Sequence, residues 1–435
     1  MHKLILLLIL YIFSSVLVSQ ELARRADFEA TFIGPDNNTP GAIVQSVEPN
    51  AILSKNGVLV GDRIIQVNDR KVLSSLDWDH IIYSIRANEI TTLHIKRGSA
   101  WLKKQVELRP LKIESHRGLD TYYESIVNDY GIRQRTIITT PDPKQKLPAI
   151  FLVQGLSCST IEMYSERSNN WVKMIESLVE ESGMVVMRVD KPGVGDSEGD
   201  CGCTDFKTEL NGYEVALQSL KMKDYVDSTR IIVYGASMGS ALAPWLAMRH
   251  NLAGVISDGT FFKTWFEHML EIERRIRQMS GDNEATIAKK MNEAYIPLYY
   301  GMLIQKKTYA QVIEEYPALK DFNYHSPEHM YGRPVTYYQQ LQNFDLASSW
   351  EKVKVPVRIL YGSNDWIMSE FDNHLIMKVL DRNNHQDHQL HIYPGLDHWN
   401  TIHESPDDSF NFKPGKWDPQ LPKLVINWAK EMIED

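Results

Sequence analysis

A chain of 435 residues is too long for one ordinary hydrophobic core, so we expect two domains or one large domain with insertions. Hydrophobic residues make up 43% and charged residues 24% of the sequence, which is typical of a globular protein and excludes a largely disordered or fibrous chain. The formal net charge of -9, without a stripe of Lys and Arg, excludes nucleic acid as a partner.

The first 20 residues have the pattern of a secretory signal peptide. Lys3 gives a basic start, an apolar run follows from Leu4 to about Val18, and the small residue Ser19 stands near the expected cleavage site. This run is shorter than the roughly 20 apolar residues of a comfortable membrane span. We therefore expect a periplasmic or secreted protein, tethered to a membrane only if the signal is not cleaved.

Residues 28–113 are expected to form a small domain rich in strands. Alternating apolar residues predict strands, Asn68-Asp69 predicts a tight hairpin turn, and an amphipathic run predicts one helix. The expected strands cover 42–47, 63–67, 91–96 and 103–108, and the expected helix covers 76–86.

The run GAIVQSVEPNAILSKNGVLVGDRIIQVNDRKV, residues 41–72, resembles a bacterial PDZ domain. In such domains a valine strand, a proline turn, a helical turn, Gly-Asp and a strand ending in Asn-Asp or Asn-Gly occur in this order. The resemblance implies capture of a peptide C-terminus by strand addition. The loop that would hold the carboxylate is polar here and contains Asp36. A spacer or lid that packs on the following domain is therefore the alternative role.

From Glu114 to Asp435 short apolar runs alternate with longer helical patterns, which predicts βαβ units and a doubly wound, mostly parallel sheet. The expected strands cover 121–126, 134–139, 149–153, 184–189, 230–234, 254–257, 355–361 and 389–393. Helices are expected at 171–181, 208–222, 238–250 and 422–432. Between about 261 and 350 the alternation stops, and a helical, aromatic stretch predicts a cap over the sheet.

The segment RIIVYGASMGSALA, residues 230–243, predicts a strand, a sharp turn and a helix. Gly235 and Gly239 leave room for the chain to reverse, and such a turn presents the hydroxyl of Ser237 at the sheet edge as a nucleophile. The N–H of Met238 would then point to the place where an oxyanion forms. The alternative is a tight turn with a structural role only.

A serine nucleophile needs a base and a group that orients the base, in the chain order Ser, acid, His. Asp365 and His398 each follow an expected strand, at the sheet edge where open α/β folds bind their ligands. We predict that His398 is the base and Asp365 the orienting acid. His403 is the rival base, a loop cap is the alternative for Asp365, and Asp397 is expected to be structural.

The second oxyanion donor is expected from the loop after the strand at 149–153, at the N–H of Leu156. These features, with Asp190-Lys191-Pro192-Gly193-Val194-Gly195-Asp196-Ser197 after the next strand, are similar to the α/β-hydrolase family. Many members have His before the first loop glycine and Arg in the second motif, where this chain has Gln154 and Lys191-Pro192. The resemblance covers residues 114–435.

The resemblance implies a serine hydrolase that forms an acyl-enzyme, with a small-molecule ester as substrate. A serine peptidase or aminopeptidase acting on peptides is the alternative within the fold, and an inactive, PDZ-linked binding or scaffold protein is the alternative outside it. The histidines lack the spacing of a metal site, so neither a metal nor a cofactor is expected. Within this fold the loop of Cys158 would approach Cys201 and Cys203, which predicts a disulfide to one of them, against the alternative of three free thiols.

Overall fold

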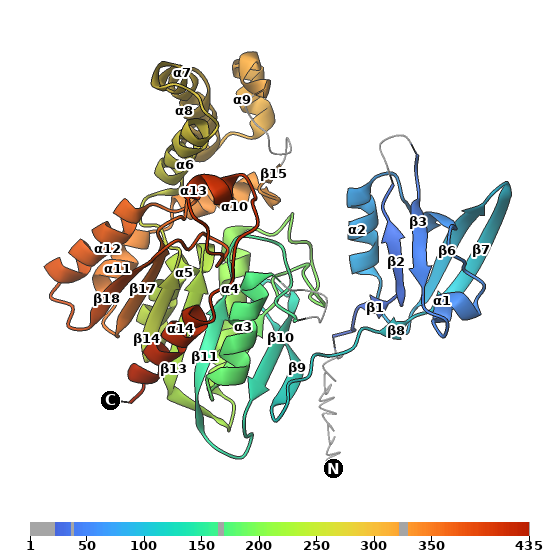
Figure 1. Ribbon diagram of the computed structural model, residues 1–435, viewed down its shortest axis with the longest axis horizontal. Coiled ribbons are helices and arrows are strands. Elements are labelled where there is room, and N and C mark those ends of the chain that lie inside the picture. Colours follow the sequence, from blue (N-terminus) through green and yellow to red (C-terminus); the bar gives the residue numbers. More distant parts are fainter. Residues whose placement is uncertain (1–21, 36–38, 164–168, 322–328, 435) are drawn as a thin grey trace, which may run out of the picture.

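The computed structural model describes residues 22–35, 39–163, 169–321 and 329–434. A small unit of strands stands beside a larger unit with a central sheet, and helices rise from one end of that sheet (Figure 1). The expected signal peptide, residues 1–20, and Asp36 lie outside the described residues. Within those residues, no helix combines the length and the apolar character needed to cross a bilayer.

The small unit is an antiparallel sheet with the strand order β2-β3-β4-β6-β7, and Asn68, at a φ of 52°, makes the tight turn from β4 to β5. Val44, Ile64 and Leu93 share its buried face with Trp78 of α2. The predicted strands and helix lie within three residues of the observed ones. The elements are β1 (Ala26–Asp27), β2 (Ala30–Ile33), β3 (Ala42–Val47), α1 (Ile52–Lys55), β4 (Arg63–Val67), β5 (Arg70–Lys71), α2 (Ser75–Ser84), β6 (Ile90–Arg97), β7 (Ala100–Glu107) and β8 (Arg109–Pro110).

The large unit is built on an eight-stranded sheet with the order β18-β17-β14-β13-β11-β12-β10-β9. Neighbours from β12 to β18 pair in parallel, whereas β10 pairs antiparallel with both β12 and β9. The predicted α/β fold with a mostly parallel sheet is confirmed. The strands are β9 (Asp120–Val127), β10 (Arg133–Thr140), β11 (Leu147–Val153), β12 (Val185–Val189), β13 (Val226–Ala236), β14 (Gly254–Asp258), β17 (Val357–Gly362) and β18 (His388–Tyr393).

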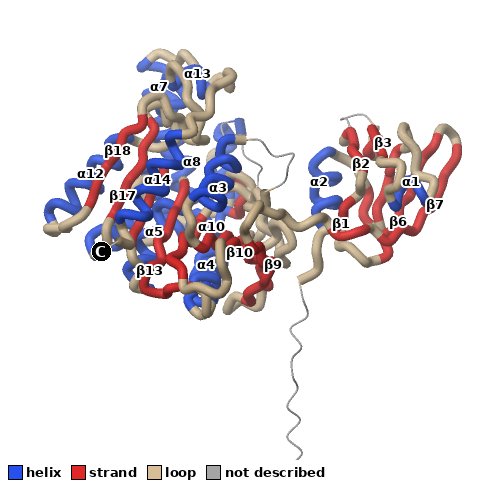
Figure 2. Tube along the Cα trace, turned by 60° about the horizontal axis from the view of Figure 1, so that its bottom comes forward, coloured by secondary structure: helices blue, strands red, loops and turns tan. Residues whose placement is uncertain are grey.

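Helices cover both faces of this sheet, as Figure 2 shows. Phe151 and Val233 point into one buried cluster, with α4, α5 and α12, while Ile150 and Ile232 point into the other, with α3 and α14. Burial on both sides explains why these strands are continuous apolar runs in the sequence. The helices are α3 (Asn170–Glu181), α4 (Phe206–Lys221), α5 (Met238–His250), α12 (Glu370–Arg382), α13 (Pro406–Phe410) and α14 (Gln420–Glu431). The sequence prediction did not include α12 and α13.

The stretch expected as a cap is helical, but its two halves differ. Its first helices, α6 to α9, rise above the sheet, whereas α10 and α11 pack on α4 and α5 and belong to the core of the large unit (Figure 1). Thr264 and Glu267 form a capping box that fixes the start of α6. The helices are α6 (Trp265–Met279), α7 (Glu284–Lys290), α8 (Ile296–Tyr299), α9 (Tyr309–Glu315), α10 (Val335–Gln342) and α11 (Leu346–Lys352), with a short hairpin of β15 (His329–Met330) and β16 (Arg333–Pro334).

Cys158 and Cys201 form a disulfide, so the predicted bridge is confirmed and its partner is Cys201. Cys203 lies outside this bridge, on the surface, with its thiol near the carboxylate of Asp200. The disulfide ties the loop after β11 to the loop after β12, and both loops lie at the carboxyl edge of the parallel sheet.

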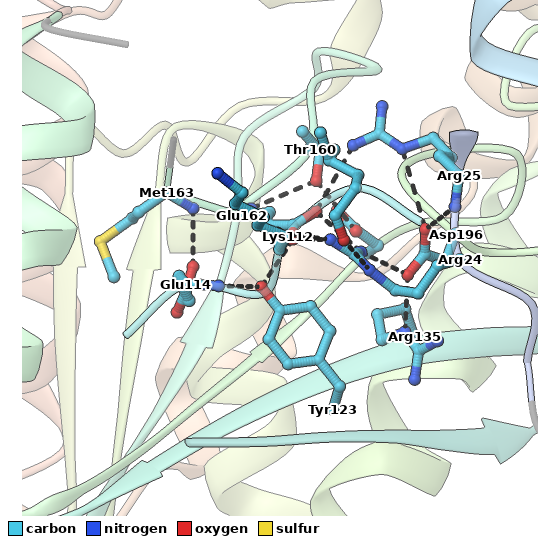
Figure 3. A network of polar contacts seen from close by, with 12 residues as sticks. Arg24, Arg25, Lys112, Glu114, Tyr123, Arg135, Thr160, Glu162, Met163 and Asp196 are labelled. Atoms are coloured by element: carbon cyan, nitrogen blue, oxygen red, sulfur yellow. Dashed lines mark hydrogen bonds and ion pairs between the residues drawn. The ribbon is translucent and has the colours of Figure 1, made fainter. Parts of the chain in front are cut away.

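Both ends of the small unit are fixed at one place on the large unit (Figure 3). Before the unit, Arg24 donates to Glu162 and to Asp196, each over 2.6 Å. After it, the guanidinium of Arg188 binds the carboxylate of Glu114, which also accepts from the backbone N–H of Met163 at 2.8 Å. These charges are nearly or fully buried and compensate one another, as buried charges must.

Replacing Glu114 by glutamine is expected to destabilise the fold by about 3 kcal/mol or more at neutral pH, because Arg188 would keep a buried charge without its partner. Burial alone would raise the pKa of Glu114, but the charge of Arg188, with hydrogen bonds from His116 and Met163, lowers it to about 2. The native protein therefore has this stabilisation above about pH 4.3 and loses it as the pH falls toward 2. Urea unfolding at neutral and acidic pH measures both effects.

Glu351→Gln is the matched control, because Glu351 pairs with Arg382 on the surface. Its free energy of unfolding should change by less than about 1 kcal/mol. Equal decreases in the free energy of unfolding of the two variants would contradict the larger contribution that we assign to the buried pair of Glu114 and Arg188.

Candidate active site

Ser237 lies at the reversal between β13 and α5, with φ of 54° and ψ of -122°. A side chain on Gly235 would overlap the backbone of Gly239, and one on Gly239 would overlap the carbonyl of Val153 on the neighbouring strand. Both positions of the predicted motif therefore require glycine. The backbone N–H of Ser237 donates to the carbonyl of Asp258 over 2.8 Å, which holds the strained turn against β14.

The structure brings the three predicted residues together. The hydroxyl of Ser237 lies 2.9 Å from Nε2 of His398, and Nδ1 of His398 lies 2.8 Å from Oδ2 of Asp365. The second oxygen of Asp365 accepts from the N–H groups of Ile367 and Met368 at 2.8 and 2.9 Å, so the carboxylate is held from behind. In the neutral ring, Nδ1–H donates to Asp365 and Nε2 accepts from the serine hydroxyl.

Burial and charge act in opposite directions at this site. Burial alone would raise the pKa of Asp365, but the charge and hydrogen bond of His398, with the two backbone N–H groups, lower it, so Asp365 is ionised at neutral pH. Burial alone would lower the pKa of His398, but the carboxylates of Asp365, Asp258 and Asp397 raise it. The imidazolium form of His398 is therefore stabilised, as a ring that takes a proton from serine requires.

The residues first considered as rivals form a separate group. Asp397 accepts from the N–H groups of Trp399 and Thr401 and from the hydroxyl of Ser409, and so shapes the loop that carries His398. His403 lies 3.2 Å from Asp397. The structure thus places His398, and not His403, beside Ser237.

The loop expected to give the second oxyanion donor packs directly on the nucleophile. A side chain on Gly155 would stand 3.0 Å from Cβ of Ser237, so glycine here lets the loop approach the nucleophile without displacing it. Leu156, the next residue, lines the cavity at Ser237 together with Met238. The two predicted donors therefore belong to segments that flank the serine.

Lys191, which sequence reasoning treated only as a departure from a motif, holds the start of this loop. Its ammonium group is buried and donates to the carbonyls of Gly155 and Ser157. Burial lowers the pKa of Lys191 to about 8, although the charge of Glu209, 3.4 Å away, opposes that shift. The lysine thus fixes the backbone next to Leu156.

The far end of the same loop is fixed by Asp190 and by the N-terminal segment. Asp190 accepts from the hydroxyl of Thr160 at 2.9 Å and from the N–H of Ile161 at 3.0 Å. Glu162 binds Arg24 and the hydroxyl of Tyr123, each over 2.6 Å (Figure 3). No local pattern could have revealed that Arg24 supports this loop, because 138 residues separate it from Glu162.

Asp258 is a second carboxylate at the site that sequence reasoning missed. It ends β14, lines the cavity, and accepts from the hydroxyl of Tyr234 at 2.7 Å. Burial raises its pKa to about 6, against the opposing effects of Tyr234 and His398. Its place at the carboxyl end of a buried parallel strand was the available signal.

The cavity at Ser237 has a volume of about 1060 Å³, which is large enough for a small organic substrate. Aromatic, aliphatic and Met side chains form most of its wall, and Trp366 and Trp399 pair at one side with ring centroids 5.8 Å apart. The residues that the structure describes contain no group of three or more His, Cys, Asp or Glu side chains that could hold a metal ion.

Comparisons with known proteins find two family models and a curated relative. A family model described as serine aminopeptidase, S33, matches residues 164–405, and a PDZ-domain model matches residues 32–108. Esterase EstD of Thermotoga maritima is 22% identical over 293 residues, which are 67% of this chain and 64% of that esterase. The match therefore spans less than two thirds of the length of EstD.

Two solved structures extend the comparison. An esterase of Pyrococcus furiosus has a TM-score of 0.45 at 13% identity, covering 74% of this chain and 96% of its own. Est1E of Butyrivibrio proteoclasticus, solved with ferulic acid bound, has a TM-score of 0.43 at 16% identity, covering 71% of this chain and 96% of its own. The PDZ-domain model confirms that the small unit is the expected PDZ domain. Because the first family model spans more than half of the sequence, the chain belongs to the serine aminopeptidase S33 family of α/β-hydrolases.

Proposed function

We propose that the protein is an exported serine hydrolase that cleaves carboxylic esters through Ser237, His398 and Asp365. The observation that carries the proposal is the continuous chain of contacts from the hydroxyl of Ser237 through His398 to the ionised Asp365, at 2.9 and 2.8 Å. This arrangement can remove a proton from serine and stabilise the positive ring that results.

In the proposed mechanism, Nε2 of His398 takes the proton of Ser237 while the serine oxygen attacks the ester carbonyl. The N–H groups of Met238 and Leu156 hold the oxyanion, and the imidazolium then gives its proton to the leaving alcohol. Water, deprotonated by His398, attacks the acyl-enzyme, and the proton returns to Ser237 as the acid is released. Lys191 supports this sequence indirectly, since it fixes the backbone that carries Leu156.

Esters are favoured as substrates by the largely apolar cavity and by the similarity to Esterase EstD. Aminopeptidase activity is the second candidate, because the family is named for that activity and Asp258 places a carboxylate on the cavity wall where a substrate ammonium group could bind.

The purified protein is expected to react with a fluorophosphonate probe at Ser237 and to hydrolyse p-nitrophenyl butyrate faster than aminoacyl p-nitroanilides. Peptide mapping of the labelled protein and the ratio of kcat/KM values for the two substrate types test these points. No labelling at Ser237 would support the alternative of a binding or scaffold protein, and faster amide cleavage would support the aminopeptidase.

Two further proposals concern the location of the protein in the cell and the ligand of the PDZ domain. Export is supported by the sequence pattern of residues 1–20 and by the Cys158–Cys201 disulfide, since such bonds persist mainly outside the reducing cytosol. Cell fractionation that finds the protein only in the cytosol would reject export. For the PDZ domain we propose a peptide C-terminus as ligand, because β2 is an edge strand that pairs only with β3 among the described residues. Failure of a C-terminal peptide library to bind would leave the spacer role.

A further inference from the structure

We call two groups of the residues that line the cavity at Ser237 its arms, according to the segments of the chain that carry them. One arm follows α6 and the residues after Asp365, and the other follows the start of α3 and the residues after His398. The first arm is lined by Trp265, His268, Met269, Ile272, Ile276, Arg277, Ile367 and Met368, and the second by Asn169, Asn170, Trp171, Val172, Ile175, Asn400 and Thr401.

The arm along α6 has a reactive end, an apolar middle and a cationic far end. His268 lines the same cavity as Ser237 and His398. Ile272 and Ile276 follow at spacings of four, so they share one face of the helix with His268. Arg277 stands nine positions beyond His268, which at the rise of an α-helix is roughly 13 Å along the axis. Nine residues are about two and a half turns, so the backbone of Arg277 lies on the other side of α6 from His268, and its long side chain reaches the cavity wall.

Arg277 has no hydrogen bond or ion pair with any side chain in the part of the chain that is described. Its Nε is shielded from solvent and lacks an acceptor. Nε of Arg275 is in the same state, but the guanidinium groups of the neighbouring arginines have partners: Arg274 pairs with Glu284 at 3.5 Å, and Arg275 donates from another nitrogen to the carbonyl of Ile367 at 2.6 Å. A shielded donor without an acceptor costs free energy, and a ligand that brings an acceptor removes that cost.

Two other polar atoms of this arm, Nε1 of Trp265 and the ring nitrogen Nδ1 of His268, also lack a partner among the described residues, and so does Nε1 of Trp366 elsewhere on the cavity wall. Burial lowers the pKa of His268 to about 3, so its ring is neutral at physiological pH and Arg277 carries the positive charge of the arm. The arm thus presents donors and one cation along an apolar wall, without a carboxylate among its lining residues. This combination suits an apolar chain that ends in an anion.

We propose that the arm along α6 binds the acyl chain of the substrate and that Arg277 binds a carboxylate at the far end of that chain. The inference rests on the proposed ester hydrolysis. The leaving group is assigned to the other arm, because His398 must protonate it and the residues that follow His398 line that arm. A guanidinium group matches a carboxylate with two parallel hydrogen bonds, so the substrate class is esters of long dicarboxylic acids in which one carboxyl stays free.

The test compares mono-p-nitrophenyl esters of adipic, suberic and sebacic acid with p-nitrophenyl alkanoates of the same chain lengths. The wild-type protein should prefer the half-esters, and the preference should grow toward the chain length that reaches Arg277. Arg277→Gln should reduce the ratio of kcat/KM for half-ester over alkanoate by roughly tenfold or more, and Arg277→Lys should restore part of it. Arg274→Gln is the matched control and should leave the ratio unchanged, because Arg274 does not line the cavity.

Each outcome decides a different question. No preference for half-esters, or an equal loss on both series in Arg277→Gln, overturns the role of Arg277 while alkanoate hydrolysis still supports the proposed function. A preference for esters whose alcohol carries the carboxylate overturns the assignment of the two arms. Absence of hydrolysis on both series, with no fluorophosphonate labelling, rejects the proposed function itself.

Discussion

Replacing Ser237 by alanine is expected to lower kcat for p-nitrophenyl butyrate by roughly 10⁶-fold and to abolish fluorophosphonate labelling. The change removes the attacking oxygen, and His398 and Asp365 then have no proton to move. Residual turnover should remain above the rate in water, because oxyanion donors and binding still act when the nucleophile is absent.

The fold should tolerate this substitution, because the hydroxyl of Ser237 contacts only the imidazole of His398 among the described side chains. Thermal unfolding should therefore occur within a few degrees of the wild type. Ser228→Ala is the control, since Ser228 lies near the opposite end of β13. Turnover in Ser237→Ala comparable to that of the control would reject the assignment of the nucleophile.

Replacing Asp365 by asparagine is expected to lower kcat by about 10⁴-fold, the size of effect known for the equivalent change in such triads. Oδ1 of Asp365 accepts from two backbone N–H groups, so an asparagine would keep its oxygen there and turn its NH₂ group toward His398. Nδ1 would then have to accept a hydrogen bond, and the proton would move to Nε2. The ring could no longer take the proton of Ser237.

The same variant should change the pH profile. The charge of Asp365 raises the pKa of His398, and kcat/KM falls when the ring becomes protonated as the pH decreases. Without that charge the pKa of His398 falls, so the acidic limb of the profile should move to lower pH. Asp258→Asn is the comparison variant, because no hydrogen bond joins Asp258 to His398. The decrease of kcat in Asp258→Asn should therefore be much smaller than in Asp365→Asn. A larger decrease of kcat in Asp258→Asn than in Asp365→Asn would assign the orienting role to Asp258 and reject it for Asp365.

Local patterns were sufficient to predict the residues at the sheet edge. Glycines at 235 and 239, apolar strands, and the order Ser, Asp, His each follow from short-range chemistry, and the structure places Ser237, His398 and Asp365 in contact. Supporting contacts could not be predicted in this way. Lys191 reaches back over more than 30 residues to the carbonyl of Gly155, and the whole PDZ domain lies between Arg24 and Glu162 in the chain.

The cap was predicted only in outline, because a helical pattern does not say against which surface a helix packs. Residues 335–352 have the same helical and aromatic character as residues 265–279, yet α10 and α11 pack on core helices while α6 lines the cavity. The helix α12 was not predicted, although Ile376, Val379 and Leu380 have the spacing of a buried helical face.

The paired ends of the PDZ domain affect how the catalytic part can be isolated. Arg24 and Arg25 precede that domain in the chain but bind Glu162 and Asp196 of the hydrolase, and β1 pairs with β8 just beside them. Truncation at Glu114 would therefore remove both arginine partners of Glu162, leaving it the hydroxyl of Tyr123, and would leave Asp196, among the described residues, with Arg135 alone. A self-sufficient hydrolase has to retain residues 22–26 and join them by a short linker to about residue 111, so that the PDZ domain is excised as an insertion.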